Sequence, residues 1–214
     1  MPEEFDKGYW EERWNQVYRD HADMAHRMGP NPQLVTEAGD LAPGTALDAG
    51  CGRGAEATWL ASRGWQVTAV DISATALRRA REHAESLGAD ITNRIDWVAA
   101  DLTTWTPNGE HFDLVTTHYV HTMTSRESLL HQLAAAVAPG GTLLVVGHYP
   151  SDQPAHDGHA SPRPASFTAE DVTASLNRDR WDIAVAEART RTATGPNGGE
   201  VTMHDSVLRA RKRP

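Results

Sequence analysis

Residues 46–54, Ala-Leu-Asp-Ala-Gly-Cys-Gly-Arg-Gly, decide the fold of this chain of 214 residues. A short apolar run ends in Asp48 and is followed by Gly50, Gly52 and Gly54. Because glycine has no Cβ, it adopts left-handed backbone angles and lets a ligand approach the main chain closely. The helix expected after this turn would present amide donors and the positive end of its dipole. The stretch therefore predicts a strand, a turn and a helix that hold a small cofactor.

Two classes of cofactor are compatible with this turn. Gly50, Gly52 and Ala55 fit the dinucleotide pattern G-x-G-x-x-A, and Asp71 lies about 20 residues on, where a ribose-binding acid is expected. Asp48 favours a cation instead, because a carboxylate just before the first glycine would lie near a pyrophosphate and repel it. S-adenosylmethionine carries an ammonium, a sulfonium and an adenosine, so it needs one acid beside the turn and another at the ribose. Asp48 and Asp71 are placed for these two contacts.

Further motifs follow the turn in a fixed order along the chain. They are Val70-Asp-Ile-Ser73, Ala100-Asp-Leu102, Phe112-Asp-Leu-Val-Thr116 and Ala138-Pro-Gly-Gly-Thr-Leu-Leu144. Together with Leu47-Asp-Ala-Gly-Cys-Gly-Arg-Gly54, this series resembles the motifs of class I S-adenosylmethionine-dependent methyltransferases. The resemblance runs from about residue 44 to the C-terminus. It implies methyl transfer from S-adenosylmethionine to a small, partly apolar metabolite through an O, S or N acceptor atom, with S-adenosylhomocysteine as product.

Alternating strand and helix patterns predict an α/β fold. We expect a Rossmann-like, seven-stranded, mainly parallel sheet with helices on both faces and a C-terminal antiparallel hairpin. Five strands are expected over 45–48, 66–71, 95–99, 112–117 and 142–146, and helices over 56–63, 74–87 and 126–137. Ser73 and Ser125 are expected to cap helices, and Gly88 and the segment 139–141 to end them. The hairpin is expected from strands 181–191 and 201–210, joined by the turn 195–199.

One domain is expected to span residues 1–214, with a core over 44–214 and an N-terminal helical lid over 1–40. In the lid, Phe5, Tyr9, Trp14 and Val17 recur near helical spacing and form an aromatic stripe. Such a stripe either packs on the sheet or covers a site at the carboxyl edge of the strands, and the two are compatible.

The resemblance assigns roles to the strand ends. It implies that Asp48 supports the ammonium of the methionine half and that Asp71 accepts from the ribose hydroxyls. Asp101 would accept from the adenine amino group, although it can equally cap the turn before Thr103. The other residues expected at the cofactor are Ala49, Gly50, Gly52, Ile72, Leu102 and His118.

Histidines are expected at the same edge of the sheet. His118 and His121 lie at the end of the fourth strand. A neutral imidazole can take a proton from an attacking hydroxyl, thiol or amine, so both are candidates for a general base. Each can instead line the pocket without moving a proton. The candidate substrate or lid residues are Tyr9, Trp10, Trp14, Tyr119 and His148.

Composition restricts the partners. A net charge of −9, from 29 acidic against 20 basic residues, disfavours a nucleic-acid substrate. The sequence has neither a membrane-spanning apolar run nor a secretory signal, and Cys51 is its only cysteine, so a cytoplasmic monomer or homodimer without disulfides is expected. His156 and His159 have no obvious third ligand, and no metal is expected. An NAD(P)-dependent oxidoreductase and a non-catalytic S-adenosylmethionine-binding protein remain as alternatives.

Overall fold

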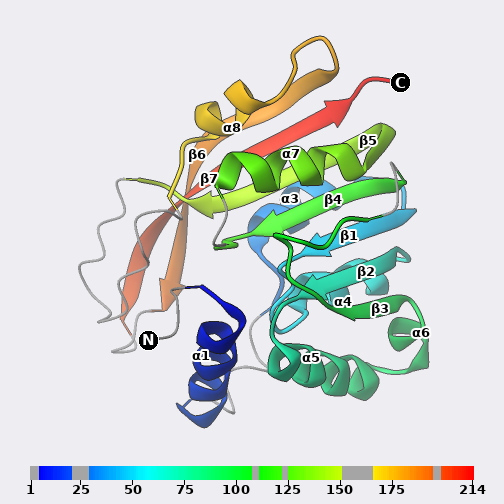
Figure 1. The fold of residues 1–214 in the computed structure, drawn as a ribbon, viewed down its shortest axis with the longest axis vertical. Helices are drawn as coiled ribbons and strands as arrows, with labels where there is room; N and C mark the ends of the chain where they lie inside the picture. The colour runs from blue at the N-terminus through cyan, green and yellow to red at the C-terminus, as the bar shows by residue number, and fades with distance from the viewer. Residues whose placement is uncertain (1–4, 21–28, 108–110, 122–124, 151–165, 195–198) are drawn as a thin grey trace.

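A seven-stranded sheet forms the centre of the fold (Figure 1). The computed structural model describes residues 5–20, 29–107, 111–121, 125–150, 166–194 and 199–214. The strands lie in the order β3-β2-β1-β4-β5-β7-β6. Their bounds are β1 Thr45–Ala49, β2 Gln66–Asp71, β3 Ile95–Ala99, β4 Phe112–His118, β5 Val137–His148, β6 Trp181–Thr194 and β7 Glu200–Lys212.

The order of the strands reverses between β1 and β4. β1 pairs in parallel with both β2 and β4, and β3 and β5 extend the parallel sheet outward. β7 runs antiparallel between β5 and β6, which confirms the expected C-terminal hairpin. Ligands of open α/β sheets bind beyond the carboxyl ends of the strands at such a reversal. The boundary between β1 and β4 is therefore where a site is expected.

Helices cover both faces of the sheet, as expected from the sequence. Their bounds are α1 Lys7–Asp20, α3 Pro32–Ala38, α4 Ala55–Ser62, α5 Ala74–Leu87, α6 Ala89–Thr92, α7 Arg126–Ala136 and α8 Ala169–Ser175. The predicted caps are confirmed at α5 and α7, where the side chains of Ser73 and Ser125 accept from the amides of Ala76 and Ser128. Gly88 follows α5 with a φ of 112°, an angle that favours glycine.

Two hydrophobic cores lie on opposite faces of the sheet. Along β1, Ala46 packs into the core that contains residues of α3, α4 and α5, whereas Leu47 and Ala49 pack into the core with α7 and α8. β5 alternates in the same way, with Leu143 on one face and Leu144 on the other. Because successive side chains of a strand point to opposite faces, one short apolar run serves both cores.

The structure corrects three expectations about element bounds. α7 ends at Ala136, and β5 begins directly at Val137, so the Pro-Gly-Gly segment 139–141 lies inside β5 instead of stopping a helix. Pairing of Val137 with Phe112 explains the early start of β5, because it adds a ladder contact that a β-branched residue favours. The expected N-terminal element is divided into α1 and the separate α3. The short helix α6 was not expected.

Several expected features lie outside the described residues. They include most of the hairpin turn, residues 195–198, and most of the polar segment after β5, residues 151–165. Within the described part of the chain, no helix is long and apolar enough to cross a membrane.

Candidate functional site

The glycine turn after β1 has the left-handed geometry that its sequence predicts. Gly50 and Gly52 have φ values of 76° and 51°. The amides of Gly50 and Cys51 both donate to the carbonyl of Val70, at 2.8 and 3.0 Å, and so bind the turn to β2. A Cβ added to Gly50 would lie 2.2 Å from Val120 Cγ2, and one added to Gly52 would lie 2.8 Å from the indole of Trp14. Only glycine therefore fits these two positions.

Asp71, at the end of β2, holds the turn and the next helix together. Its Oδ2 accepts from the Gly52 amide at 2.8 Å, and its Oδ1 accepts from the Ser73 amide at 2.9 Å. Burial raises the pKa of Asp71, although the two amides act in the opposite direction. Each carboxylate oxygen can accept more than one hydrogen bond, so these contacts leave capacity for ligand hydroxyls.

Asp48, at the end of β1, is a buried carboxylate that lacks part of its hydrogen bonding. The side chain is 1% exposed, and its Oδ2 has no hydrogen-bond partner among the described residues. Burial raises the pKa of Asp48 well above its ordinary value, and the charges of Glu56 and Asp71 raise it further. A buried acceptor without a partner is costly, and a cation bound beside it would relieve that cost.

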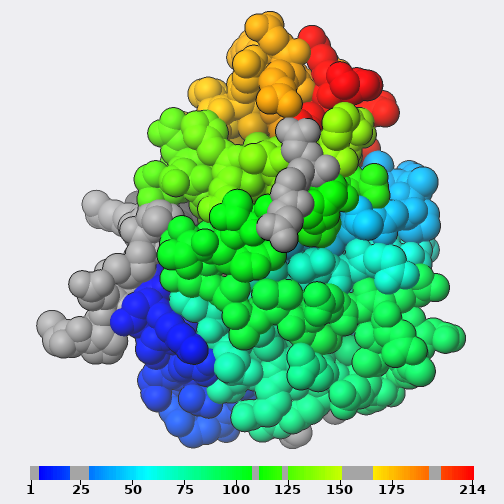
Figure 2. All heavy atoms as spheres, turned by 45° about the vertical axis from the view of Figure 1, so that its right-hand side comes forward, coloured from blue at the N-terminus to red at the C-terminus, as the bar shows by residue number. Residues whose placement is uncertain are grey.

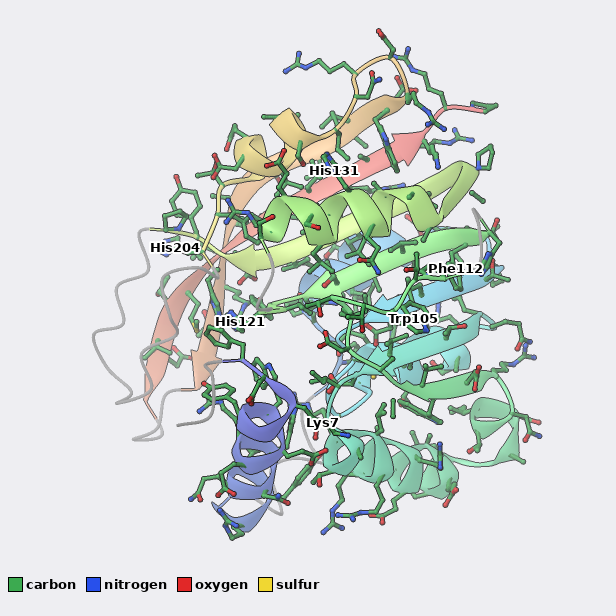
Figure 3. The ribbon with its side chains drawn as sticks, viewed as in Figure 1. Lys7, Trp105, Phe112, His121, His131 and His204 are labelled. Carbon is green, nitrogen blue, oxygen red and sulfur yellow. The ribbon has the colours of Figure 1, made fainter. Side chains whose placement is uncertain are left out.

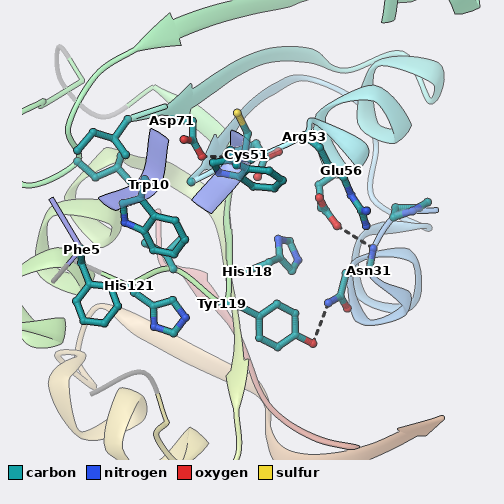
Figure 4. Close-up of a pocket in the computed structure, with 18 of the residues that line it drawn as sticks. Phe5, Trp10, Asn31, Cys51, Arg53, Glu56, Asp71, His118, Tyr119 and His121 are labelled. Carbon is teal, nitrogen blue, oxygen red and sulfur yellow. Dashed lines mark hydrogen bonds between the residues drawn. The ribbon is translucent and has the colours of Figure 1, made fainter. Parts of the chain in front are cut away.

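A cavity of about 420 Å³ opens at the carboxyl ends of β1, β2 and β4. Its volume lies in the range of small-molecule sites. Figure 4 shows Asp71 and Glu56 in the upper part of the view and the rings of Phe5 and His121 in the lower part, with Trp10 just below Asp71. Among the predicted site residues, the cavity is lined by Trp10, Trp14, Asp48, Gly50, Gly52, Asp71, Ile72, Asp101, Leu102, His118, Tyr119 and His121.

Three predicted site residues lie behind the cavity wall. Ala49 is fully buried in β1, and its carbonyl accepts from the hydroxyl of Thr117. Tyr9 packs edge-on against Phe5 and Trp10. His148 lies against Tyr119, with 4.6 Å between ring centroids. These side chains support residues that line the cavity and are absent from its lining.

The loop after β3 forms the edge of the cavity farthest from β5. Asp101 Oδ1 accepts from the Thr103 amide at 2.8 Å, so the side chain does cap a turn. It also lines the cavity, together with Ile72 and Leu102. The capping role and the binding role are therefore both available to Asp101.

His118 and His121 enter the cavity from the end of β4. Figure 3 places His121 and Phe112 at opposite ends of that strand. In each histidine Nδ1 is buried without a hydrogen-bond partner among the residues that the structure describes. Burial lowers the pKa of both imidazoles, to about 4 for His121, where His148 and Arg13 add to the effect. Both imidazoles are therefore neutral at pH 7.

The helix α1 covers the glycine turn. Its Trp14 lies directly on Gly52, and Tyr18 stacks on Trp14 with 5.8 Å between ring centroids. The Glu11 carboxylate accepts from the amides of Ala74 and Thr75 at 2.6 and 3.3 Å, which fixes α1 to the N-terminus of α5. Figure 2 shows α1 in blue against this part of the molecule.

Replacing Glu11 with alanine is expected to raise the Kd for S-adenosylmethionine, the donor that the sequence resemblance implies, by about three- to tenfold, because it releases α1 from the end of α5, a contact of about 1 kcal/mol. Although burial raises the pKa of Glu11, hydrogen bonds from Thr75 and Ala74 outweigh it and lower the pKa. The contact is therefore present above the ordinary glutamate pKa and is lost as the pH falls through the lowered value. Titration calorimetry at pH 7 and 4 checks this, with the exposed Glu12→Ala as matched control. Equal affinities of the two variants would contradict it.

Several residues in or beside the cavity escaped the sequence analysis, among them Glu56, Asn31, Arg191 and Glu11. Glu56 lies in the first turn of α4, where an acid is ordinary, and its Oε1 accepts from the amide of Asn31 at 2.9 Å. Asn31 caps α3 and also donates to the hydroxyl of Tyr119. Arg191 reaches the cavity from β6, and Glu11 reaches α5 from α1. Apart from the cap of α3 by Asn31, these contacts have no local sequence signal, because each joins segments far apart in the chain.

No group of three histidine, cysteine or acidic side chains that could hold a metal occurs among the described residues. His156 and His159 lie outside them.

Two features together define the Rossmann-like methyltransferase class. The strands lie in the order β3-β2-β1-β4-β5-β7-β6 with β7 antiparallel, and a glycine turn lies between two strands that end in acidic residues. Comparison with known proteins agrees with this class. The profile of the family described as "Methyltransferase domain" matches residues 46–141.

Individual relatives extend the match over most of the chain. Thiocyanate methyltransferase 1 of Brassica oleracea is 30% identical over 202 residues, which cover 89% of this chain and 85% of that protein. Trans-aconitate 2-methyltransferase of Paracidovorax citrulli is 33% identical over 148 residues, which cover 67% of this chain and 53% of that protein. The chain thus spans about half the length of several curated relatives that it matches. The crystal structure of TehB from Haemophilus influenzae shares the fold, with a TM-score of 0.67 at 20% identity over 95% of this chain and 67% of that one.

The chain belongs to the class I S-adenosylmethionine-dependent methyltransferases. This membership decides between the two cofactors that the glycine turn allowed. The donor is S-adenosylmethionine, and the dinucleotide alternative is set aside.

Proposed function

We propose that this chain methylates a small, partly apolar acceptor at an oxygen, sulfur or nitrogen atom. The observation that carries the proposal is that one cavity joins the acidic glycine turn to a wall of aromatic and histidine side chains. We call the acidic side with the glycine turn the donor seat and the side with the aromatic and histidine rings the acceptor wall. The two lie next to each other in one cavity. The curated relatives are named for acceptors as different as thiocyanate and trans-aconitate, which supports a small acceptor without selecting one.

The proposed donor seat fits the residues present. The unpartnered Oδ2 of Asp48 suits an ammonium, and Gly50 and Gly52, which line the cavity and have no Cβ, suit close contact with the methionine half. Asp71 is proposed to accept from the ribose hydroxyls, and Asp101 from the adenine amino group. When bound, S-adenosylmethionine supplies a methyl group already activated by its sulfonium. The chain's own contribution is to align the acceptor and to exclude water from the cavity.

The proposed acceptor wall consists of stacked rings. His121 lies 5.5 Å from Phe5 and 5.9 Å from Trp10 between ring centroids, with interplanar angles of 20° and 17°. Such faces favour a flat or apolar acceptor body. Because the imidazole of His121 contacts the rings of Phe5, Trp10 and His148, His121 is assigned to shaping the wall. His118 has no ring contact among the described residues, and its unpartnered Nδ1 makes it our candidate for the general base.

Replacing His118 with asparagine is expected to lower kcat by about 100-fold or more if His118 removes the acceptor proton. His121→Phe keeps a ring in the stack and is expected to change KM more than kcat. Since the pKa of both imidazoles is lowered, the fall in kcat/KM that protonation of a histidine base causes should occur only below the ordinary imidazole pKa of about 6.5, on the acid side of the profile. Steady-state kinetics over pH 4 to 9 check this. An unchanged kcat for His118→Asn would remove His118 from proton transfer and leave alignment as the source of the rate.

The function is tested in two stages. Titration calorimetry with S-adenosylmethionine and S-adenosylhomocysteine first tests the donor seat, and absence of binding would overturn the proposal. Release of S-adenosylhomocysteine is then measured with a panel of thiols, phenols and amines. Binding of the donor without turnover on any acceptor supports the alternative of a non-catalytic S-adenosylmethionine-binding protein.

The remaining expectations also belong to this proposal. We treat residues 1–214 as one domain, with a lid over 1–40 that contains α1 and α3 and a core over 44–214. The contact between Trp14 and Gly52 supports a covering role for α1. A cytoplasmic monomer or homodimer that acts on a small molecule, and not on nucleic acid, agrees with the acidic composition. Light scattering of the purified chain tests the oligomeric state.

A further inference from the structure

One cation reaches the cavity from the half of the sheet opposite the proposed donor seat. Arg191, on β6, lines the cavity, and its guanidinium lies 5.6 Å from the centroid of the Tyr119 ring. The Nε atom donates to both oxygens of Asp205, at 3.1 and 2.9 Å. Tyr119 in turn donates to Asp205 at 2.7 Å. The arginine is therefore held in place at the wall by a fully buried carboxylate.

This arginine belongs to a cluster with more positive than buried negative charge. Arg189 pairs with Glu37 at 2.6 Å, and Arg209 approaches the same carboxylate at 3.5 Å. Glu37 and Asp205 are the buried carboxylates in these pairs, against three arginines. The third acid, Glu187, which pairs with Arg189, is 56% exposed and is screened by solvent. With Glu187 counted, the described cluster has three arginines and three carboxylates, and Arg191 is its arginine that lines the cavity.

The donor side of the same cavity is acidic. Four acidic side chains line it there, Asp48, Glu56, Asp71 and Asp101, against one arginine, Arg53. The end of the cavity with carboxylates favours binding of a cationic group, and the end with the fixed guanidinium favours binding of an anionic group. The acidic end suits the donor assigned above, which leaves the guanidinium without a role in donor binding.

We infer that the acceptor is an anion, a small molecule whose carboxylate or equivalent group pairs with Arg191 while its flat or apolar body lies against Phe5, Trp10 and His121. This inference rests on the proposed function and specifies its acceptor. The guanidinium suits it because its planar donors match a carboxylate in a bidentate pair, and Asp205 accepts from its Nε atom, with the Tyr119 side chain as a further neighbour. Arg191 is accordingly a specificity-determining residue.

The test compares benzoate with benzamide, two probes of the same shape that differ in charge. Titration calorimetry is carried out on the full chain saturated with S-adenosylhomocysteine, at low salt. In the wild type, benzoate is expected to bind at least tenfold more tightly than benzamide. In Arg191→Gln the ratio should fall to about one. Because this change removes the charge partner of the buried Asp205, the double variant Arg191→Gln with Asp205→Asn is measured as well, and it should show the same loss.

The matched control is Arg189→Gln, which removes an arginine of the same cluster that does not line the cavity. It is expected to keep the preference for benzoate. The inference is overturned if benzoate binds no more tightly than benzamide, if neither probe binds, or if the preference survives in both Arg191 variants. Binding of S-adenosylhomocysteine in the same samples reports on the proposed function separately, since it does not require Arg191.

Discussion

Asp48→Asn is expected to make the ligand-free protein more stable and at the same time to abolish measurable binding of S-adenosylmethionine. The carboxylate is buried, and its Oδ2 has no partner among the described residues, so its charge costs free energy in the absence of ligand. An amide of nearly the same shape removes that charge. We expect a gain of about 1–3 kcal/mol in the free energy of unfolding at pH 7. The same change removes the anion proposed to pair with the ammonium, and a loss of more than 100-fold in affinity should follow.

The pH dependence of Asp48 has a definite sign. Burial and the neighbouring acids raise the pKa of this carboxyl in the folded protein. Its contribution to stability is therefore complete below the pKa of the unfolded chain and is lost as the pH rises through the folded value. A bound cation requires the ionised form, so affinity for S-adenosylmethionine should increase with pH over the same range. The advantage of Asp48→Asn in stability should disappear at acid pH.

Thermal unfolding with and without S-adenosylmethionine, at pH 5 and 8, checks both effects of Asp48→Asn. The exposed Asp96 on β3 provides the matched control, and Asp96→Asn should leave the melting temperature and the ligand shift unchanged. A variant of Asp48 that binds the donor as the wild type does would exclude this carboxylate from the donor seat.

Asp71→Ala is expected to lose both stability and affinity. It removes the acceptor of the Gly52 and Ser73 amides, and these bonds connect the end of β2 to the glycine turn and to the start of α5. Two buried amides without acceptors cost about 2–4 kcal/mol of folding free energy. Affinity for S-adenosylmethionine should fall by more than 100-fold, because the turn loses its fixed geometry and the ribose its proposed acceptor.

Asp113, at the end of the strands opposite the cavity, is a control that separates the loss of stability from the loss of affinity. Asp113 accepts from the amide of Thr45 at 2.8 Å, at the start of β1, far from the cavity end of that strand. Asp113→Ala should lower the melting temperature but leave the Kd for S-adenosylmethionine unchanged. Calorimetric titrations and melting curves of both variants give the comparison. If Asp71→Ala also kept the wild-type Kd, the proposed role of Asp71 at the ribose would be wrong.

The regular elements were predictable where one local signal fixed them. The bounds of α5 agree with the prediction because Ser73 caps its first turn and Gly88 ends it. The bounds of β2 agree because a buried apolar run stops at an acid. By contrast, Pro139-Gly140-Gly141 was expected to break a helix and lies within β5, because pairing with β4 outweighs local propensity. Only the assembled sheet contains that pairing.

The sequence by itself determined which residues we propose for the donor half of the site. Asp48, the glycines and Asp71 lie within 24 consecutive residues of one strand, turn, helix and strand unit, so local chemistry and spacing are enough to place them together. Tertiary structure alone decided the other half, because Glu11, Asn31 and Arg191 meet this unit only after the chain has folded α1, α3 and β6 around it. A contact between residues 86 or more positions apart, such as that of Tyr119 with Asp205, leaves no periodic or local trace in a single sequence. The methyl donor could thus be predicted from the sequence, whereas the charge of the proposed acceptor wall depends on the folded geometry.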